Sequence, residues 1–425
     1  MTNLCNDNGF CGTHRTHPAG CAPQDAGGMR QATRAPQTAG GVQGAGDIQG
    51  AGGMTRRNFV RLATATCGLA ATGSFLSGCA GFVNPLAKTQ IIVDDVGRAV
   101  EIPAPNHLTN VYYTSPLAQI FCLTMAPDLM AGSCVAYDAD QLQFLPQGTE
   151  RLDVMGSLSS GGVIDISALK YNDVQIVFSI SGTDLTDVNI NDALALQEET
   201  GIPVVLIDGS FDRIGDTYRL LGTCLGRAER AEELARYCES IYERVTTAVS
   251  AVPNDELATY YFAEGQEGLQ SEPDISQHSL AFQTVRGVNV AANVDPNEPG
   301  RSAGMLDNRH MVNISIEEIR AWDPEFIIAW DTQTRSGASG LIGIQPEWSQ
   351  VRAVKNRRVY TMPNLPFAFC DRPPGVNRFL GIQWLANLFY PKYYDVDMVQ
   401  VVREFYSTCY WRDISEEQAR AILAQ

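Results

Sequence analysis

Residues 228–250 read AERAEELARYCESIYERVTTAVS, a pattern typical of one long amphipathic helix. The apolar side chains recur at steps of three and four along one stripe: Leu234, Cys238, Ile241, Val245 and Val249. At about 1.5 Å per residue the helix would be a rod about 35 Å long, and Pro253 follows it closely. We therefore predict a rigid connecting helix over residues 228–252, with globular parts before and after it.

On both sides of this helix, short apolar runs alternate with helical patterns. Strand-like runs lie at residues 110–114, 175–180, 203–207, 257–263, 325–330 and 358–362, and helical patterns at 116–123, 164–169 and 192–200. Such alternation is typical of a parallel sheet covered by helices on both faces. The predicted fold is α/β, with two doubly wound lobes (residues 91–227 and 253–425) joined by one long rigid helix and a ligand cleft between them. A terminal helix is expected at 415–424.

The N-terminal region differs in composition from the rest. Residues 1–53 are rich in Gly, Ala, Gln and Thr without apolar periodicity, so we expect a disordered extension or a misassigned start, with Met54 as the true first residue. Residues 54–79 resemble a twin-arginine lipoprotein signal, in which Arg56 and Arg57 precede a short apolar run and Cys79 carries the lipid. The run is too short and polar for a membrane span. Residues 80–90 would form a tether.

Charge limits the classes of partner. The chain has 31 basic and 48 acidic residues and a formal net charge of −17. This acidity argues against nucleic acid and against adsorption to anionic lipid, so membrane attachment is expected through the lipid on Cys79.

Six cysteines remain after the signal and its anchor: Cys122, Cys134, Cys224, Cys238, Cys370 and Cys409. None forms a C-x-x-C pair, which leaves little support for a zinc ribbon or a thioredoxin-like site. Export permits disulfides, and Cys122 and Cys134 are the pair nearest in sequence, but isolated core cysteines are an equal alternative.

Several segments, in their order and spacing, resemble the ABC-transporter solute-binding proteins of the iron–siderophore, haem and cobalamin (class III) family. They are residues 93–103, 111–132, 201–205, 314–328 and 351–360, and residues 371–385 are similar to a subgroup with poorly defined ligands. The resemblance implies capture of an iron–siderophore or other metal complex for an ABC permease and ATPase. Corrinoid, haem or a molybdate-like oxyanion is the alternative ligand, and a non-transport surface or sensor module is the second alternative.

The resemblance also implies an exported monomer without cofactor, lipid-anchored to the outer face of the cytoplasmic membrane or in the periplasm. No hydrolase elbow, zincin helix or Walker loop is present, so an enzyme is not expected. A bare metal site is not expected either, because His107, His278 and His310 are widely spaced; His310 as an axial ligand is a weaker alternative.

Ligands of open α/β sheets sit beyond the carboxyl ends of the strands. The residues predicted to contact the ligand lie in loops at those ends: Tyr113, Ser115, Ser159, Gly161, Asp331, Phe367, Asp371 and Arg372. Arg372 could clamp an anionic group, or instead pair with Asp371. The Gly- and Ser-rich loop 156–162 could hold an anion at a helix starting near residue 164, or be a surface turn. The aromatic residues could stack on a ligand or belong to the core.

Two acidic residues are candidates for contact with the permease. By the resemblance, Asp165 in the first lobe and Glu317 in the second match the acids that pair with permease arginines. The alternative is that both charges only favour the helix N-termini on which they are expected to lie.

Overall fold

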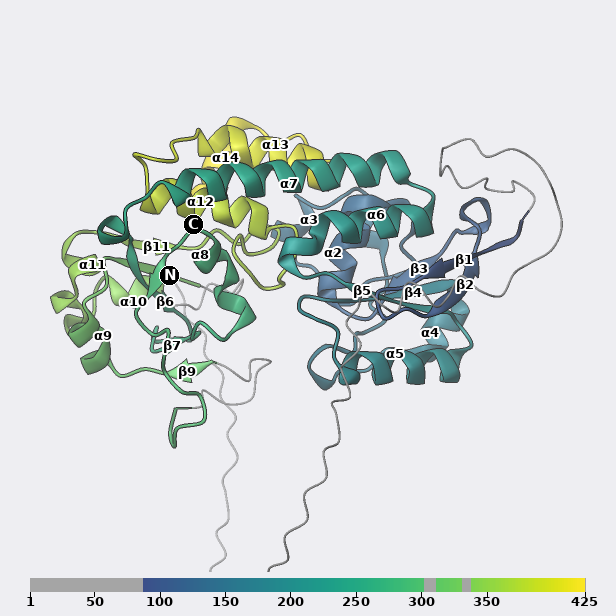
Figure 1. Ribbon diagram of the computed structural model, residues 1–425, viewed down its shortest axis with the longest axis horizontal. Helices are drawn as coiled ribbons and strands as arrows, with labels where there is room; N and C mark the ends of the chain where they lie inside the picture. Colours follow the sequence, from purple (N-terminus) through teal and green to yellow (C-terminus); the bar gives the residue numbers. More distant parts are fainter. Residues whose placement is uncertain (1–86, 302–310, 331–337, 425) are drawn as a thin grey trace, which may run out of the picture. The chain divides into compact units, whose positions relative to one another are not determined.

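The computed structural model describes residues 87–301, 311–330 and 338–424, which belong to one compact unit that begins at Gly81 (Figure 1). The predictions for residues 1–53, for the signal 54–79 with Arg56, Arg57 and Cys79, and for Asp331 and His310 lie outside the described residues. No helix in the described part of the chain is both long enough and apolar enough to cross a bilayer.

The described chain opens with an antiparallel hairpin. Strand β1 (Thr89–Val93) pairs with β2 (Ala99–Pro103), and the turn between them uses Gly97 at a positive φ of 82°. Ile92 and Val100 face the core while their neighbours along the strands are exposed, which is the alternation expected of an edge hairpin.

The first sheet is parallel, with the order β3-β4-β5. Its strands are β3 (Val111–Tyr113), β4 (Ile176–Ser181) and β5 (Val204–Asp208). In Figure 1, α2 (Pro116–Met125) and α6 (Ile214–Leu225) lie on one side of this sheet and α5 (Asp187–Thr200) on the other. The short helices α3 (Ala139–Leu142) and α4 (Ile166–Tyr171) lie in the connections.

The second sheet is also parallel, with the order β11-β10-β6-β8. Its strands are β6 (Thr259–Ala263), β8 (Val288–Asn289), β10 (Phe326–Ala329) and β11 (Val359–Thr361). The helices α8 (Leu280–Thr284), α9 (Ile316–Trp322), α10 (Ser339–Ile342) and α11 (Arg352–Lys355) accompany it, and β7 (Gln270–Ser271) pairs antiparallel with β9 (Val312–Asn313). Two parallel sheets with covering helices confirm the predicted α/β class.

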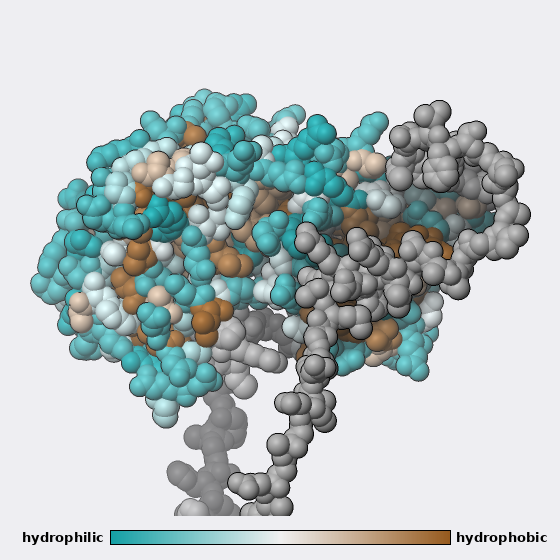
Figure 2. All heavy atoms as spheres, viewed as in Figure 1, coloured by the Kyte–Doolittle hydropathy of each residue, from teal (hydrophilic) through white to brown (hydrophobic). Residues whose placement is uncertain are grey.

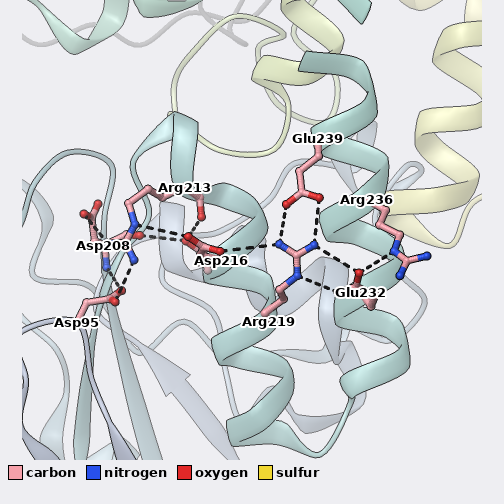
Figure 3. A network of polar contacts seen from close by, with 9 residues as sticks. Asp95, Asp208, Arg213, Asp216, Arg219, Glu232, Arg236 and Glu239 are labelled. Atoms are coloured by element: carbon pink, nitrogen blue, oxygen red, sulfur yellow. Dashed lines mark hydrogen bonds and ion pairs between the residues drawn. The ribbon is translucent and has the colours of Figure 1, made fainter. Parts of the chain in front are cut away.

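The long helix is also confirmed, as α7 (Ala228–Ser250), with all five predicted stripe residues buried. Arg219 of α6 pairs with Glu232 at 2.8 Å and with Glu239 at 2.6 Å, which joins α6 to α7 (Figure 3). Because these side chains are more than a third exposed, the network contributes little to stability. The close approach of the helices rests instead on Gly222, where an added Cβ would lie 2.3 Å from Ala231 Cβ.

The prediction that one helix alone joins the two parts is incomplete. Helices α12 (Arg378–Phe389), α13 (Met398–Tyr410) and α14 (Glu416–Leu423) lie beside α7 (Figure 1), and one continuous hydrophobic core includes them together with both sheets. Arg230 of α7 donates to Thr124 O of α2 at 3.0 Å and also to Thr408 O of α13. The lobe boundaries at residues 227 and 253 remain predictions.

Helix α12 begins at Arg378 and is not amphipathic. Nearly all of its side chains are buried, because α12 packs between α7, α8 and α13. The predicted terminal helix is confirmed as α14, with a capping box between Ser415 and Gln418.

The six described cysteines are buried and free, so the core interpretation holds and Cys122 is not bonded to Cys134. Burial raises the pKa of the Cys134 thiol to about 12, as expected for an inert core thiol. On the face seen in Figure 2, hydrophilic side chains predominate and apolar ones form small separate groups.

Candidate functional site

The carboxyl end of the first sheet contacts segments that belong to the second. Gly182 directly follows β4, and a Cβ there would lie 3.1 Å from Gln277 Oε1 and 3.1 Å from Pro374 Cγ. Gly375 lies similarly close to Leu117 of α2. The segment around residue 374 therefore lies at the junction of the two sheets, where open α/β folds bind ligands.

Arg372 is the central side chain of this segment. Its Nε donates to Glu264 Oε1 at 2.9 Å and its Nη2 to Glu272 Oε1 at 2.8 Å. The Trp330 ring centroid is 4.5 Å from the guanidinium carbon. We call Glu264, Glu272 and Arg372 the Arg372 cluster. The carboxylates hold the guanidinium at the edge of the sheet, since Glu264 directly follows β6 and Trp330 directly follows β10.

The neighbouring Asp371 has different partners. It accepts from Arg378 Nη2 at 2.8 Å and contacts His278 Nδ1, and its side chain is fully buried. We call His278, Asp371 and Arg378 the Asp371 cluster. Arg372 thus forms its ion pairs with Glu264 and Glu272, at 2.7 and 2.8 Å, and not with Asp371 as the alternative interpretation expected.

The charges of the Asp371 cluster stabilise one another. Burial alone would raise the pKa of Asp371, but the charges of His278 and Arg378 outweigh it and lower the pKa to about 2. Burial alone would lower the pKa of His278, and the carboxylate of Asp371 reverses this and raises it. Asp371 is therefore ionised throughout the neutral range.

The pKa of Glu264 is shifted in the opposite direction from that of Asp371. Burial raises its pKa to about 7, with Arg372 opposing the rise and the charge of Glu272 adding to it. The second carboxylate oxygens, Oε2 of Glu264 and Oε2 of Glu272, are buried and have no hydrogen-bond partner among the described residues. Because each of these oxygens lacks a hydrogen-bond partner, burying the ionised form of its carboxyl group costs more free energy.

Three of the predicted ligand residues gather at the end of β3. Leu158 N donates to Thr114 O at 2.8 Å, which holds the turn Ser159–Gly161 beside this strand end. Gly161 is exposed at a φ of 73°, a conformation that favours glycine. Ser115 caps α2 by accepting from Ala118 N at 3.1 Å.

The expected anion site at the following helix is not supported. Helix α4 begins at Ile166 rather than near residue 164, and Asp165 caps it by accepting from Ala168 N at 3.0 Å. An anion at this helix end would meet the Asp165 carboxylate. The loop thus resembles the alternative of a surface turn.

The two predicted aromatic contacts lie in the core. Tyr113 is fully buried and donates from its hydroxyl to Gly132 O at 2.7 Å. Phe367 is 4% exposed and packs edge-on against Tyr137. Because both rings are already covered by protein, stacking on a ligand would require their exposure, and the structure corrects these two predictions.

Sequence reasoning missed Glu264, Glu272, His278 and Trp330. The usable signal was that Glu264 and Trp330 directly follow strands. Glu272 also follows a strand, β7, but a strand of two residues leaves no recognisable pattern in the sequence, and His278 lies in a 3-10 helix of three residues (Gln277–Ser279).

No group of three His, Cys, Asp or Glu side chains in the described ranges is arranged to hold a metal ion. Two surface cavities lie away from the Arg372 cluster. One, of about 500 Å³, lies between β2 and α5 and includes Glu101 and Leu194; the other, of about 510 Å³, lies near the start of β10 and β11 and includes Phe326 and Tyr360. Neither is lined by a predicted ligand residue.

Comparison with known proteins agrees with this architecture. Residues 180–365 match the family model described as periplasmic binding protein. The molybdate-binding protein MolA of Haemophilus influenzae is 29% identical over 276 residues, which cover 61% of this chain and 73% of that protein.

Solved structures of similar fold include an ABC transporter solute-binding protein from Sulfurospirillum deleyianum, with a TM-score of 0.69 and 23% identity over 79% of this chain and 99% of that one. A periplasmic solute-binding protein from Veillonella parvula has a TM-score of 0.64 and 22% identity, over 79% of this chain and 97% of that one. At these identities the likeness concerns the fold. The comparisons therefore show a likeness to periplasmic binding proteins, in sequence over residues 180–365 and in fold over about four fifths of the chain.

Proposed function

We propose that this protein captures an anionic, metal-containing ligand at the junction of its two sheets and delivers it to the permease. An iron–siderophore or comparable metal complex is the first candidate. A molybdate-like oxyanion is the second, favoured by the similarity to MolA. Both kinds of ligand present oxygen atoms with negative charge, which an arginine recognises through paired hydrogen bonds.

The observation that carries this proposal is the position of Arg372. It lies two residues from Pro374, which contacts Gly182 across the junction, and its side chain is 14% exposed against 2% for Arg378. Of these two arginines, Arg372 is therefore the one that a ligand can reach. Ser115, Ser159 and Gly161 lie at the end of β3 and are proposed as contacts from the first sheet.

A ligand screen tests the proposal. The full-length protein is heated with ferric siderophores, haem, cobalamins, molybdate and tungstate, and unfolding is followed by fluorescence. A ligand at 100 times its dissociation constant should add about 2.7 kcal/mol to the free energy of unfolding. A saturable shift with one class identifies the ligand, and a shift only with neutral or cationic compounds contradicts the anionic assignment.

We propose that Asp165 and Glu317 contact the permease. Both side chains are exposed at the N-terminus of a helix that leads into a parallel strand: Asp165 is the N-cap of α4 before β4, and Glu317 lies in the first turn of α9 before β10. The pair therefore occupies corresponding places beside the two sheets.

Reversing both charges (Asp165→Lys with Glu317→Lys) should reduce ligand uptake by cells about tenfold or more while ligand binding by the purified protein is unchanged. The matched control reverses Asp187 and Glu229, two exposed acids in the first turns of α5 and α7. Equal uptake by the two double variants would refute the docking assignment.

We also propose that residues 54–79 direct export, with Arg56 and Arg57 in the signal, and that Cys79 carries the lipid anchor. The support is the order of basic pair, apolar run and small residues before the cysteine. Mass spectrometry of the mature N-terminal peptide tests the assignment, which an unmodified Cys79 would contradict.

A further inference from the structure

The Arg372 cluster contains more negative than positive charge. Glu264 and Glu272 are both fully buried, and both direct Oε1 at the same Nη2 of Arg372. With both carboxylates ionised, these three side chains sum to one negative charge. A proton on either carboxylate makes them neutral.

The surrounding groups offset this imbalance only while His278 is protonated. Arg378 and Asp371 balance each other, so the positive charge of His278 is the one left over, and the full imbalance is present once the pH rises above the pKa of His278, which Asp371 raises. Tyr261 of β6 is fully buried and donates to Gly268 O at 2.9 Å, and burial holds its pKa well above the usual range, so it stays neutral. The described groups that act on Glu264 are thus Arg372, Glu272 and His278.

An anion that approaches Arg372 enters a site that already carries a negative charge. In a buried setting the repulsion between two such charges is large, whereas a neutral cluster leaves the arginine charge available to the anion. The arginine must also share with the ligand the hydrogen bonds that it gives to the two glutamates. A proton weakens its attachment to Glu264 and reduces this competition.

We infer that an anionic ligand binds at Arg372 together with one proton, and that Glu264 is the group that takes up this proton. The inference rests on the proposed function, because it requires that the ligand be an anion at this site. Glu264 is preferred over Glu272 because burial already favours its protonated form near neutral pH. The protein is then a carrier whose affinity falls as the medium becomes alkaline.

The direction and size of the change in affinity with pH follow from the linkage between proton binding and ligand binding. If the free protein titrates at about 7 and the complex stays protonated, the affinity falls about tenfold between about pH 6 and about pH 8. Proton uptake on binding rises over the same range from about 0.1 to about 0.9 per ligand.

The test uses isothermal titration of the full-length protein with molybdate at low micromolar concentration and with ferric citrate, in buffers of different ionisation enthalpy at the two pH values. The buffer dependence of the heat gives the proton uptake directly in the unaltered protein. Glu264→Gln, a neutral mimic of the protonated side chain, should bind equally well at both pH values and take up no proton. Glu267→Gln, an exposed glutamate in the same turn, is the matched control and should behave as the unaltered protein does.

Three outcomes overturn the inference: affinity without pH dependence, pH dependence that persists in Glu264→Gln, and no binding of either anion at either pH. If neither anion binds, the wider ligand screen still tests the solute-binding role. Binding of a neutral or cationic ligand in that screen would support the role. The failure of the inference and the failure of the proposed function are therefore separate results.

Discussion

Replacement of Arg378 by methionine is expected to lower the free energy of unfolding by about 3–5 kcal/mol, because it leaves a buried carboxylate without one of its two cationic partners. Arg378 donates to Asp371 Oδ1 at 2.8 Å and to Gln277 O at 2.7 Å, and its side chain is only 2% exposed. Methionine preserves much of the side-chain volume, so the decrease in the free energy of unfolding reflects mainly the removal of the guanidinium charge. Urea unfolding followed by circular dichroism measures it.

The loss should also depend on pH. Without Arg378, the charge of Asp371 relies on protonated His278, whose pKa the aspartate raises. The stabilisation from His278 is present below its unfolded pKa and is lost as the pH rises through its folded pKa, so the variant should be weakest in alkaline buffer. Arg420→Met, which removes a pair of exposed charges on α14, is the control and should change little. A variant of Arg378 as stable as this control would contradict the role given to the buried pair.

Substitution of Gly381 by alanine is the second change with a large expected effect, a loss of about 3 kcal/mol. A Cβ at this position would lie 2.5 Å from Phe369 O and 2.8 Å from Cys370 Cα. Both atoms belong to the backbone of the segment that leads to Asp371, so neither can rotate away. The whole of α12 would have to shift from its place in the core.

The matched control is Gly340→Ala in α10, where an added Cβ meets nothing within 4 Å. This control should be as stable as the unaltered protein or slightly more stable, because alanine favours helix over glycine. Thermal unfolding of the two variants side by side measures the difference. Equal melting temperatures of the two variants would show that α12 can move away from the backbone of residues 369–370 without a loss of stability.

The sequence predicted elements better than it predicted contacts. Patterns of apolar residues in the sequence identified six parallel strands and α7, because burial of one face or of both faces restricts which residues can occur at each position. The all-round burial of α12 left no such trace, since a helix covered on every side has no polar stripe to mark it. The role of α13 in contacting α2 is likewise a long-range property that local patterns do not carry.

The same contrast between predicted position and predicted contact holds for the candidate site. Arg372 was predicted because a Pro-rich segment with a charged residue stands out at a strand end. Tyr113 was assigned to the ligand because it lies near a strand end, but all three residues of β3 are buried and its hydroxyl donates to Gly132 O. Glu272 and His278 enter only through the folded geometry, which brings them to residues 371–372 from about a hundred positions away.

Arg230 ties three helices, α2, α7 and α13, at one point near the start of α7. A joint braced in this way resists bending, so the protein would keep nearly the same outline with and without ligand. A permease that receives the ligand as proposed would then recognise loading from local features near the junction, such as the electrical charge of a filled site, rather than from the spacing of the two halves. Recognition of cargo would in that case be a matter of electrostatics and not of shape.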